Sequence, residues 1–167
     1  IGIPTNCTML FGTIETAKER IIHLEKLRNL QDETNGFQCF VPYPFLPDHS
    51  RLPEAQLSTS NEILRVIAVS RLMLDNIPHI KAYRMNIGDN IGQMGLICGA
   101  DDIDGTVGHE EIMHSAGSKT SLTTSSEDLA RLILEIGCRP IRRNTIYTSF
   151  EESQFEEAIE ARLPILV

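Results

Sequence analysis

The sequence lacks a run of about 18 consecutive apolar residues, the length that a helix needs to cross a bilayer. The chain also opens without the pattern of a secretory signal peptide. A surplus of positive charge is missing as well, since the net charge is −8. Nucleic-acid backbones and anionic membranes attract clustered Lys and Arg, so we expect neither as a partner.

Closely spaced cysteines are also missing. The four that occur lie far apart in the chain and match no metal-binding spacing: Cys7, Cys39, Cys98 and Cys138. No H-E-x-x-H pattern accompanies them, so we predict no metal ligands in this chain. We interpret the cysteines as reduced, small apolar side chains of a cytoplasmic protein.

The 167 residues suit one domain with a sizeable core. The chain opens at Ile1 without a Met and close to an expected strand, so we expect a fragment or a processed chain. Four segments have the pattern of strands, and helical patterns follow them. These segments are IPTNCTML, FQCFVPYPF, HIKAYRMN and ADDID.

Capping boxes of the form S/T-x-x-E mark the expected starts of three helices. They are formed by Thr16 with Glu19, Thr59 with Glu62, and Thr124 with Glu127. Pro42 and Pro44 are expected to stop the second strand, because proline cannot donate to a ladder. Residues 142–150 have the pattern of coil or a short edge strand, and residues 151–167 that of a helix with an apolar tail.

Strands that alternate with helices imply an α/β fold with a parallel sheet and right-handed crossovers. Four such strands form either half of an eight-stranded barrel or a small open sheet. In both folds ligands bind at the carboxyl ends of the strands. The acidic stretch GADDIDGTVGHEE, residues 99–111, follows the fourth strand at such an end, so it is either a solvated loop or part of a polar site.

Strand parity sorts the polar residues of the third and fourth strands by face. Asp102 and Asp104 share one face, and Asp101 points to the other. Buried carboxylates need partners, so we expect either ion pairs with Arg84, Lys81 or Arg65, or a polar ligand. His79, Lys81 and Tyr83 share a face of the third strand, either as a polar barrel layer or as part of a site.

A second candidate lies at the end of the first strand, where Gly12 is followed three residues later by Glu15. The pattern fits a tight turn in which Glu15 stabilises the next helix N-terminus. It equally fits a backbone platform for a flat ligand, because glycine lets a ring approach the main chain.

Four separated blocks carry a family resemblance: GIPTNCTMLFGTIET, LRNLQDETNGFQCFVPYPFLPD, RVIAVSRLMLDNIPHIKAY and GADDIDGTVGHEEIMHSAGS. They cover nearly all of residues 1 to 150. Together they resemble the carboxyl-terminal half of radical S-adenosylmethionine (SAM) enzymes. That group includes aminodeoxyfutalosine synthase of menaquinone biosynthesis, cyclic dehypoxanthinyl futalosine synthase and the deazaflavin-core (FO) synthase, and GADDIDGTV is most similar to the first.

The resemblance implies a (βα)8 barrel of the TIM type. Residues 1–108 would form units five to eight, and residues 109–167 a carboxyl-terminal loop, helix and tail. The family's G-x-I-x-G-x-x-E motif, whose main chain meets the adenine of SAM, falls on Thr8, Leu10, Gly12 and Glu15, with Thr8 in place of the first glycine. Asn6 and Thr8 would face the barrel interior near the adenosine.

The resemblance also suggests roles for the later polar residues. Asp102 or Asp104 would accept hydrogen bonds from the ribose hydroxyls or the methionine ammonium, unless they form a structural ion pair with Arg84. The expected substrate carries two carboxylates, so its candidate contacts are His79, Lys81, Tyr83 and Arg84. Lys81 and Arg84 differ in parity, so only one of them can point into the barrel.

The family's C-x-x-x-C-x-x-C loop, which holds the [4Fe–4S] cluster, is absent from this sequence. The resemblance places that loop in a missing amino-terminal half-barrel, so we expect this chain alone not to cleave SAM. The complete enzyme would add a 5′-deoxyadenosyl radical to 3-[(1-carboxyvinyl)oxy]benzoate and form aminodeoxyfutalosine.

Other functions stay open. The complete enzyme could be of the futalosine-cyclase or FO-synthase type. The chain could also be a non-catalytic half-barrel partner subunit, or a small-molecule binding module. Because half a barrel leaves two open sheet edges, we also expect a possible homodimer.

Overall fold

The computed structural model describes residues 2–48, 50–105, 111–121 and 124–152. Its elements are β1 Thr5–Phe11, α1 Ala17–Thr34, β2 Phe37–Pro44, α2 Ser60–Met73, β3 His79–Ala82, α3 Arg84–Ile87, α4 Asp89–Ile97, β4 Asp102–Ile103, α5 Ile112–Ser115, α6 Ser126–Glu135, β5 Ile141–Arg143 and β6 Phe150–Glu152. Strands β1 to β4 form one parallel sheet in chain order. This confirms the predicted fold class, because four parallel strands that alternate with helices are consistent with half of a (βα)8 barrel.

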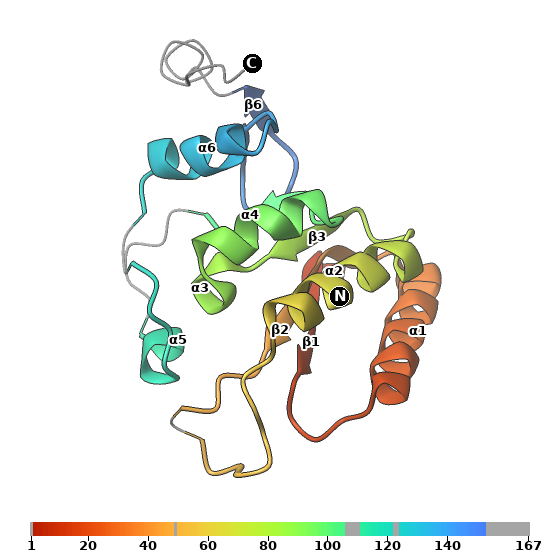
Figure 1. The fold of residues 1–167 in the computed structure, drawn as a ribbon. Coiled ribbons are helices and arrows are strands. Elements are labelled where there is room, and N and C mark those ends of the chain that lie inside the picture. Colours follow the sequence, from red (N-terminus) through yellow and green to blue (C-terminus); the bar gives the residue numbers. More distant parts are fainter. Residues whose placement is uncertain (1, 49, 106–110, 122–123, 153–167) are drawn as a thin grey trace.

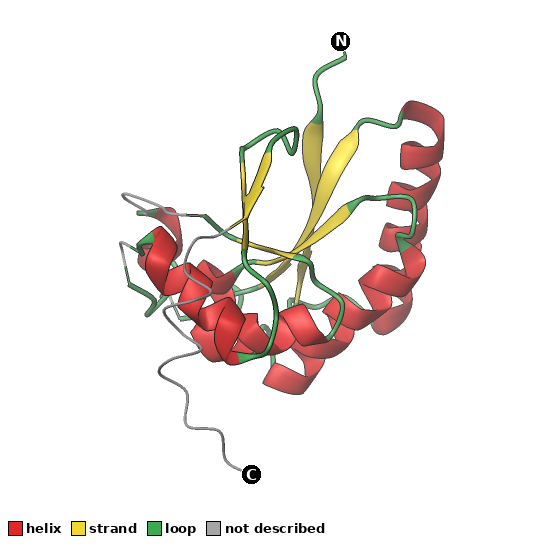
Figure 2. Ribbon diagram, turned by 90° about the horizontal axis from the view of Figure 1, so that it is seen from above, coloured by secondary structure: helices red, strands yellow, loops and turns green. Residues whose placement is uncertain are grey.

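Helices α1, α2 and α4 lie along one face of this sheet (Figures 1 and 2). Cys7, Met9 and Phe11 of β1 point to that face and are buried in the main hydrophobic core. The alternate residues Asn6, Thr8 and Leu10 point to the other face and are exposed. The sheet therefore has an outer face covered by helices and an inner face that is open along β1.

The capping residues explain where the helices begin. Thr16 and Glu19 form the complete capping box predicted for α1, with both reciprocal hydrogen bonds. At α2 the Thr59 hydroxyl accepts from the Glu62 amide, but Glu62 turns its carboxylate to another partner. The box predicted at Thr124 is wrong, because Ser125 caps α6.

Both prolines lie inside β2, so the prediction that they stop the strand is wrong. The amide of Phe45 donates to the carbonyl of Phe11, which shows that odd-numbered residues of β2 direct their backbone groups to β1. Pro42 and Pro44 therefore lack their N–H only on the side of β3, where the ladder already ends at Phe40. The ladder with β1 stays intact up to Pro44.

Strand β3 is shorter than predicted, since it ends at Ala82. Tyr83 caps the short helix α3, and Arg84 is its first residue. Residues 142–150 contribute to a two-stranded antiparallel hairpin of β5 and β6, where the sequence indicated coil or an edge strand. Of the predicted carboxyl-terminal helix, Glu151 and Glu152 belong to β6, and residues 153–167 lie outside the described residues.

In the described part of the chain, no helix combines the length and the apolar character needed to cross a membrane. The longest helix, α1, has 18 residues and carries charged side chains along its length.

The caps of α1 and α2 differ in a way that stability measurements can detect. We expect Thr16→Ala to lower the free energy of unfolding by about 1 kcal/mol, because it removes the hydroxyl that accepts from the Glu19 amide and donates to the Glu19 carboxylate, while the Thr16 amide keeps its bond to Glu19. Thr59→Ala should cost less, since only one hydrogen bond is lost. Urea denaturation checks both variants, and equal losses would contradict the assignment of a single complete box.

Candidate functional site

The inner face of the sheet carries side chains in rows that cross the strands. Nearest the amino ends of the strands, Asn6, Cys39 and His79 are register partners. The next row contains Thr8, Val41, Lys81 and Asp102. The row nearest the carboxyl ends begins with Leu10 and Tyr43. The rows divide the inner face into an amino end and a carboxyl end.

Asp102 is the centre of a polar network at the amino end. Its carboxylate accepts from Lys81 Nζ at 2.5 Å and from Tyr147 OH at 2.6 Å. Arg143 adds a bidentate contact, with Nε and Nη2 each 2.8 Å from a carboxylate oxygen. Asp102 is only 8% exposed. Burial raises the pKa of Asp102, but Arg143 and Lys81 outweigh that effect, so its pKa lies below the ordinary value.

Two of the three partners of Asp102, Arg143 and Tyr147, belong to the β5–β6 hairpin, and Lys81 belongs to β3. The ring of Tyr147 stacks on His79, with centroids 4.4 Å apart, and the guanidinium of Arg143 lies over the same tyrosine ring. In Figure 1 the hairpin lies at the opposite end of the sheet from the loops that follow β1 and β2. His79, Lys81 and Asp102 are thus brought together, but at the amino end and around a segment that sequence reasoning did not connect with them.

Asp101 has a different environment, in agreement with the predicted parity. It accepts from Arg71 Nη2 at 2.6 Å and from the amide of Ile80 at 2.8 Å. His79 Nδ1 lies 2.8 Å from its second oxygen. These contacts join the end of α2 to the start of β3, so Asp101 has a structural role.

Arg84 is buried, and its polar groups contact other residues of this chain. Its amide donates to Asp104 Oδ1, and its guanidinium contacts Asp89, Asp104 and the hydroxyl of Thr124. The contact between Arg84 Nε and Asp104 Oδ2 is 3.4 Å long, and neither atom has a hydrogen bond within the described residues. Burial therefore dominates and raises the pKa of Asp104.

The turn after β1 is organised by Glu15 at the carboxyl end of the sheet. Glu15 accepts from the amides of Gly12 and Thr13 at 2.6 and 2.8 Å, and from the Thr13 hydroxyl at 2.6 Å. Burial raises the pKa of Glu15, but these hydrogen bonds outweigh it and lower the pKa to about 2. Glu15 therefore holds the turn as a permanent carboxylate, which is the tight-turn interpretation of the motif.

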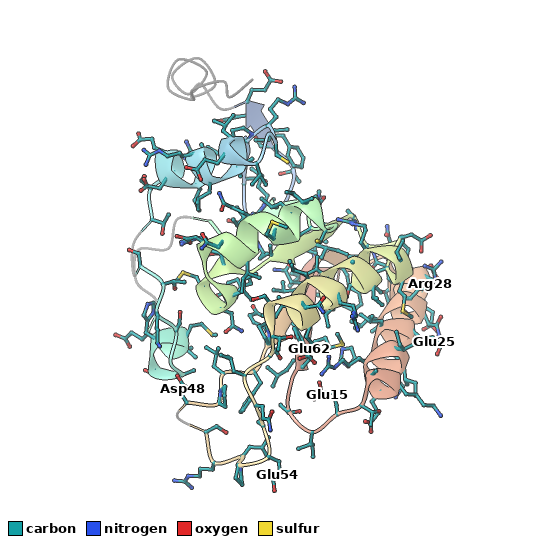
Figure 3. The ribbon with its side chains drawn as sticks, viewed as in Figure 1. Glu15, Glu25, Arg28, Asp48, Glu54 and Glu62 are labelled. Atoms are coloured by element: carbon teal, nitrogen blue, oxygen red, sulfur yellow. The ribbon has the colours of Figure 1, made fainter. Side chains whose placement is uncertain are left out.

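Arg20 fixes this turn to the rest of the domain. Its guanidinium lies 2.7 Å from both Glu15 and Glu62, which belong to the β1–α1 turn and to α2 (Figure 3). It also lies over the ring of Phe11, 5.2 Å from the centroid. The sequence offered no local signal for Arg20, because the residues it joins are 47 positions apart.

Gly12 lies in the left-handed region, with φ +84°. A Cβ at this position would overlap the hydroxyl of Ser58. That hydroxyl is buried and has no hydrogen-bond partner among the described residues. The backbone therefore makes a close approach that only glycine permits, which keeps the ligand-platform interpretation of the turn open.

The carboxyl end also carries aromatic and amide groups. Tyr83, a predicted substrate contact, packs edge to face on Tyr43 with centroids 5.0 Å apart. Asn86 donates to the carbonyl of Pro44, and its side-chain oxygen has no partner in the described part of the chain. Together with exposed Leu10 and the Gly12 turn, these groups form the open end of the inner face.

An iron–sulfur cluster does not fit the residues of this chain. Cys7 and Cys39 point to opposite faces of the sheet, and Cys98 and Cys138 lie on other elements. The described residues contain no group of three His, Cys, Asp or Glu side chains that could hold a metal ion. A flat ligand fits better, because Asn6, Thr8 and Leu10 leave the inner face open up to the turn at Gly12.

Four parallel strands that alternate with helices are consistent with half of an α/β barrel, a fold class that many enzymes share. Residues 34–155 match the family model described as the CofH/MqnC C-terminal region. The chain belongs to this family, and its similarity is to enzymes of the radical SAM type.

Individual relatives agree with this assignment. The chain is 45% identical over 151 residues to the aminodeoxyfutalosine synthase of Thermus thermophilus, covering 88% of this chain and 41% of that protein. It is 39% identical to the 5-amino-6-(D-ribitylamino)uracil–L-tyrosine 4-hydroxyphenyl transferase of Methanothermobacter thermautotrophicus, covering 91% of this chain and 43% of that protein. It is 38% identical to the cyclic dehypoxanthine futalosine synthase of Streptomyces coelicolor, covering 88% of this chain and 36% of that protein. The chain thus spans about two fifths of the length of the relatives it matches.

The close approach at Gly12 predicts a coupled pair of substitutions. Gly12→Ala should lower the free energy of unfolding by about 1–3 kcal/mol, because it combines a strained φ with an overlap at Ser58. Ser58→Ala alone should be close to neutral, since its hydroxyl has no partner in the described residues. The double variant Gly12→Ala/Ser58→Ala should regain the part of the free energy of unfolding that the overlap with Ser58 costs. Strictly additive effects in chemical denaturation would contradict this contact.

The low pKa of Glu15 predicts a loss of stability in acid. A carboxyl whose folded pKa lies below its ordinary value of 4.5 stabilises the fold above that pH, and the stabilisation disappears as the pH falls toward 2. The free energy of unfolding should therefore be lower for Glu15→Gln at neutral pH, and the difference should shrink below pH 4.5. Glu25→Gln, on the exposed surface of α1, is the control. A constant difference for Glu15→Gln across this range would contradict the prediction.

Proposed function

We propose that this chain acts as the carboxyl-terminal half of a radical SAM enzyme of the aminodeoxyfutalosine synthase type. The complete enzyme would add the 5′-deoxyadenosyl group to 3-[(1-carboxyvinyl)oxy]benzoate, as a transferase of menaquinone biosynthesis. Identities of 45% and 41% to two aminodeoxyfutalosine synthases support this choice. One structural observation carries the proposal. The inner-face side chains of β1, Asn6, Thr8 and Leu10, are exposed, and the strand they belong to ends at the Gly12 turn.

SAM would supply the adenosyl group, and residues of β1 and its turn would hold the adenosine. Leu10 is 56% exposed on the inner face and offers an apolar surface to a flat ring. Asn6 and Thr8 offer polar groups on the same face. The left-handed conformation of Gly12 and the hydrogen bonds to the Glu15 carboxylate hold the amides of Gly12 and Thr13 in place. The [4Fe–4S] cluster belongs in this proposal to the amino-terminal half.

The substrate would lie at the carboxyl end of the inner face. Tyr83 and Asn86 are at that end, whereas His79 and Lys81 are held in the network around Asp102. Asp104 would contact a ligand only if its carboxylate moved away from the Arg84 guanidinium, which lies 3.4 Å from it. The structural ion pair that the sequence left open therefore accounts better for Asp102 and Asp104 than a contact with SAM.

The first sheet edge needs a partner half-barrel. On β1 the alternate residues Asn6, Thr8 and Leu10 direct their backbone groups away from β2. His23 Nε2 lies 3.0 Å from the Thr8 carbonyl and so covers part of this edge. Such covering is typical of an edge that must not pair with a wrong strand.

The second edge is β4, which pairs with β3 within the described residues. A groove of about 880 Å³ runs along it. Its apolar lining includes Leu96, Leu129 and Ile133. The amino-terminal half-barrel of the proposed enzyme is the occupant that would cover both edges at once. A second copy of this chain is the alternative, and it would make a homodimer of half-barrels.

A second candidate function is that of the futalosine cyclase or the FO synthase. Relatives of both kinds match the chain over 88% and 91% of its length. Cytoplasmic location stays an expectation that fits the cysteines, which are all free thiols.

A chimera tests the proposed function. The matching 151 residues of the Thermus thermophilus enzyme would be replaced by this chain, and the cluster reconstituted without oxygen. We expect aminodeoxyfutalosine from SAM and 3-[(1-carboxyvinyl)oxy]benzoate, detected by mass spectrometry. Gly12→Ala should abolish turnover, while Gly137→Ala should keep it, because Gly137 also has a positive φ but lies after α6.

Iron content and circular dichroism show whether the chimera is folded and loaded. A folded, loaded chimera without aminodeoxyfutalosine would contradict the proposal. Turnover of dehypoxanthine futalosine, or of 5-amino-6-(D-ribitylamino)uracil with L-tyrosine, would then identify the alternative.

A further inference from the structure

The inner face of β2 is buried, although the neighbouring inner face of β1 is open. Asn6 and Thr8 are exposed, while their register partners Cys39 and Val41 are not. Cys39 is 0% exposed. In Figure 2 the helices of the described residues that cover the sheet lie on its other side, so these helices do not account for the burial of Cys39 and Val41.

The covering segment is the hairpin of residues 141–152. Tyr147 stacks on His79, and the carbonyl of Thr145 accepts from the side chain of Gln38. The hydroxyl of Tyr147 donates to Asp102 at 2.6 Å, and burial together with this hydrogen bond raises the pKa of Tyr147. The hairpin thus contacts the amino ends of β2, β3 and β4 at once.

The loop of the hairpin is built to present Tyr147. Asn144 Oδ1 accepts from the amides of Thr148 and Ser149, and Asn144 Nδ2 donates to the Thr148 hydroxyl. Tyr147 itself has φ +55°, a left-handed conformation that is uncommon for a bulky residue. A strained residue of this kind persists only where the surrounding contacts determine its position.

We propose that residues 141–152 form a plug that closes the amino end of the barrel, with Asp102 as its anchor. Asp102, Lys81 and His79 are then positioning residues for the plug, and ligands reach the inner face from the carboxyl end. The plug goes beyond the proposed reaction, because it depends on contacts within this chain and not on the identity of the substrate.

Two buried cysteines allow the plug to be tested in this chain as it exists. Cys39 lies under the hairpin, while Cys7 lies on the opposite face of the sheet within the helix-covered core. Local opening of the plug would expose Cys39 alone, whereas unfolding would expose both thiols. Burial raises the pKa of Cys7 to about 12 and that of Cys39 to about 11, so both react slowly in the closed state.

Arg143 and Arg142 give a matched pair of variants. Arg143→Gln removes the bidentate contact to Asp102, while Arg142→Gln alters an exposed neighbour in the same strand. The charge of Arg143 lowers the pKa of Cys39, so its removal makes that thiol intrinsically less reactive. A faster reaction of Cys39 in Arg143→Gln would therefore show that the thiol has become more accessible to the reagent. It could not be explained by a higher intrinsic reactivity of the thiol.

The measurement is the rate of alkylation of each thiol by N-ethylmaleimide, read from cysteine-containing peptides by mass spectrometry. We expect Cys39 to react about tenfold faster or more in Arg143→Gln, as loss of a charged hydrogen bond allows. The rate at Cys7 should not change, and Arg142→Gln should match the parent chain. Tyr147→Phe should raise the Cys39 rate by a smaller factor, because the stacked ring remains.

Two results would overturn the plug. One is an unchanged Cys39 rate in both Arg143→Gln and Tyr147→Phe. The other is an equal rise at Cys7 and Cys39, because the hairpin would then be part of the global core and not a separate closure. Neither result depends on turnover, so failure of the plug and failure of the proposed function are distinguishable.

Discussion

Alternation along four parallel strands is the constraint on which the rest of this structure depends. It sends Cys7, Met9 and Phe11 into the helix-covered core and leaves the residues between them on the inner face. A buried outer face stabilises the sheet, so the inner face does not have to be apolar. It can carry polar side chains, both near the Gly12 turn at the carboxyl end and around Asp102 at the amino end.

The network around Asp102 is closed by the hairpin, although Gln38 Oε1 beside it is buried without a partner among the described residues. Asp102 has three partners, and two of them come from the hairpin. At the carboxyl end, the Ser58 hydroxyl and the Asn86 side-chain oxygen are buried without partners among the described residues. Buried polar atoms without partners are costly, so such groups are more typical of a ligand site than of a finished core.

Local patterns predicted the features that depend on neighbours in sequence. The different environments of Asp101 and Asp102, and the capping box of Thr16, follow from a few adjacent residues. The predicted box at Thr124 failed because the hydroxyl of Thr124 binds Arg84, 40 positions away. Long-range partners override local propensity in this way, and a single sequence does not reveal them.

The candidate site was predicted less completely than the fold, and for the same reason. Asn6, Thr8, Leu10 and Gly12 lie together as expected because they share one strand and its turn. The roles of Lys81 and Asp102 depend on Arg143 and Tyr147, whose contacts cross 41 and 45 positions. The alternation of side chains along a strand predicts the face on which such a residue lies. It does not predict which segment packs over that face.

Charge pairing limits how the chain can recognise an anionic substrate. The buried or half-buried cations near the inner face already have carboxylate partners: Lys81 and Arg143 pair with Asp102, and Arg84 pairs with Asp89 and Asp104. A substrate carboxylate beside them would compete with these pairs, and breaking a buried pair is costly. Lys81 and Arg84, the cations that the strand pattern brought forward, are therefore poorly placed to recognise a substrate carboxylate. Under the proposed function, cationic contacts to the substrate would then come from the proposed amino-terminal half.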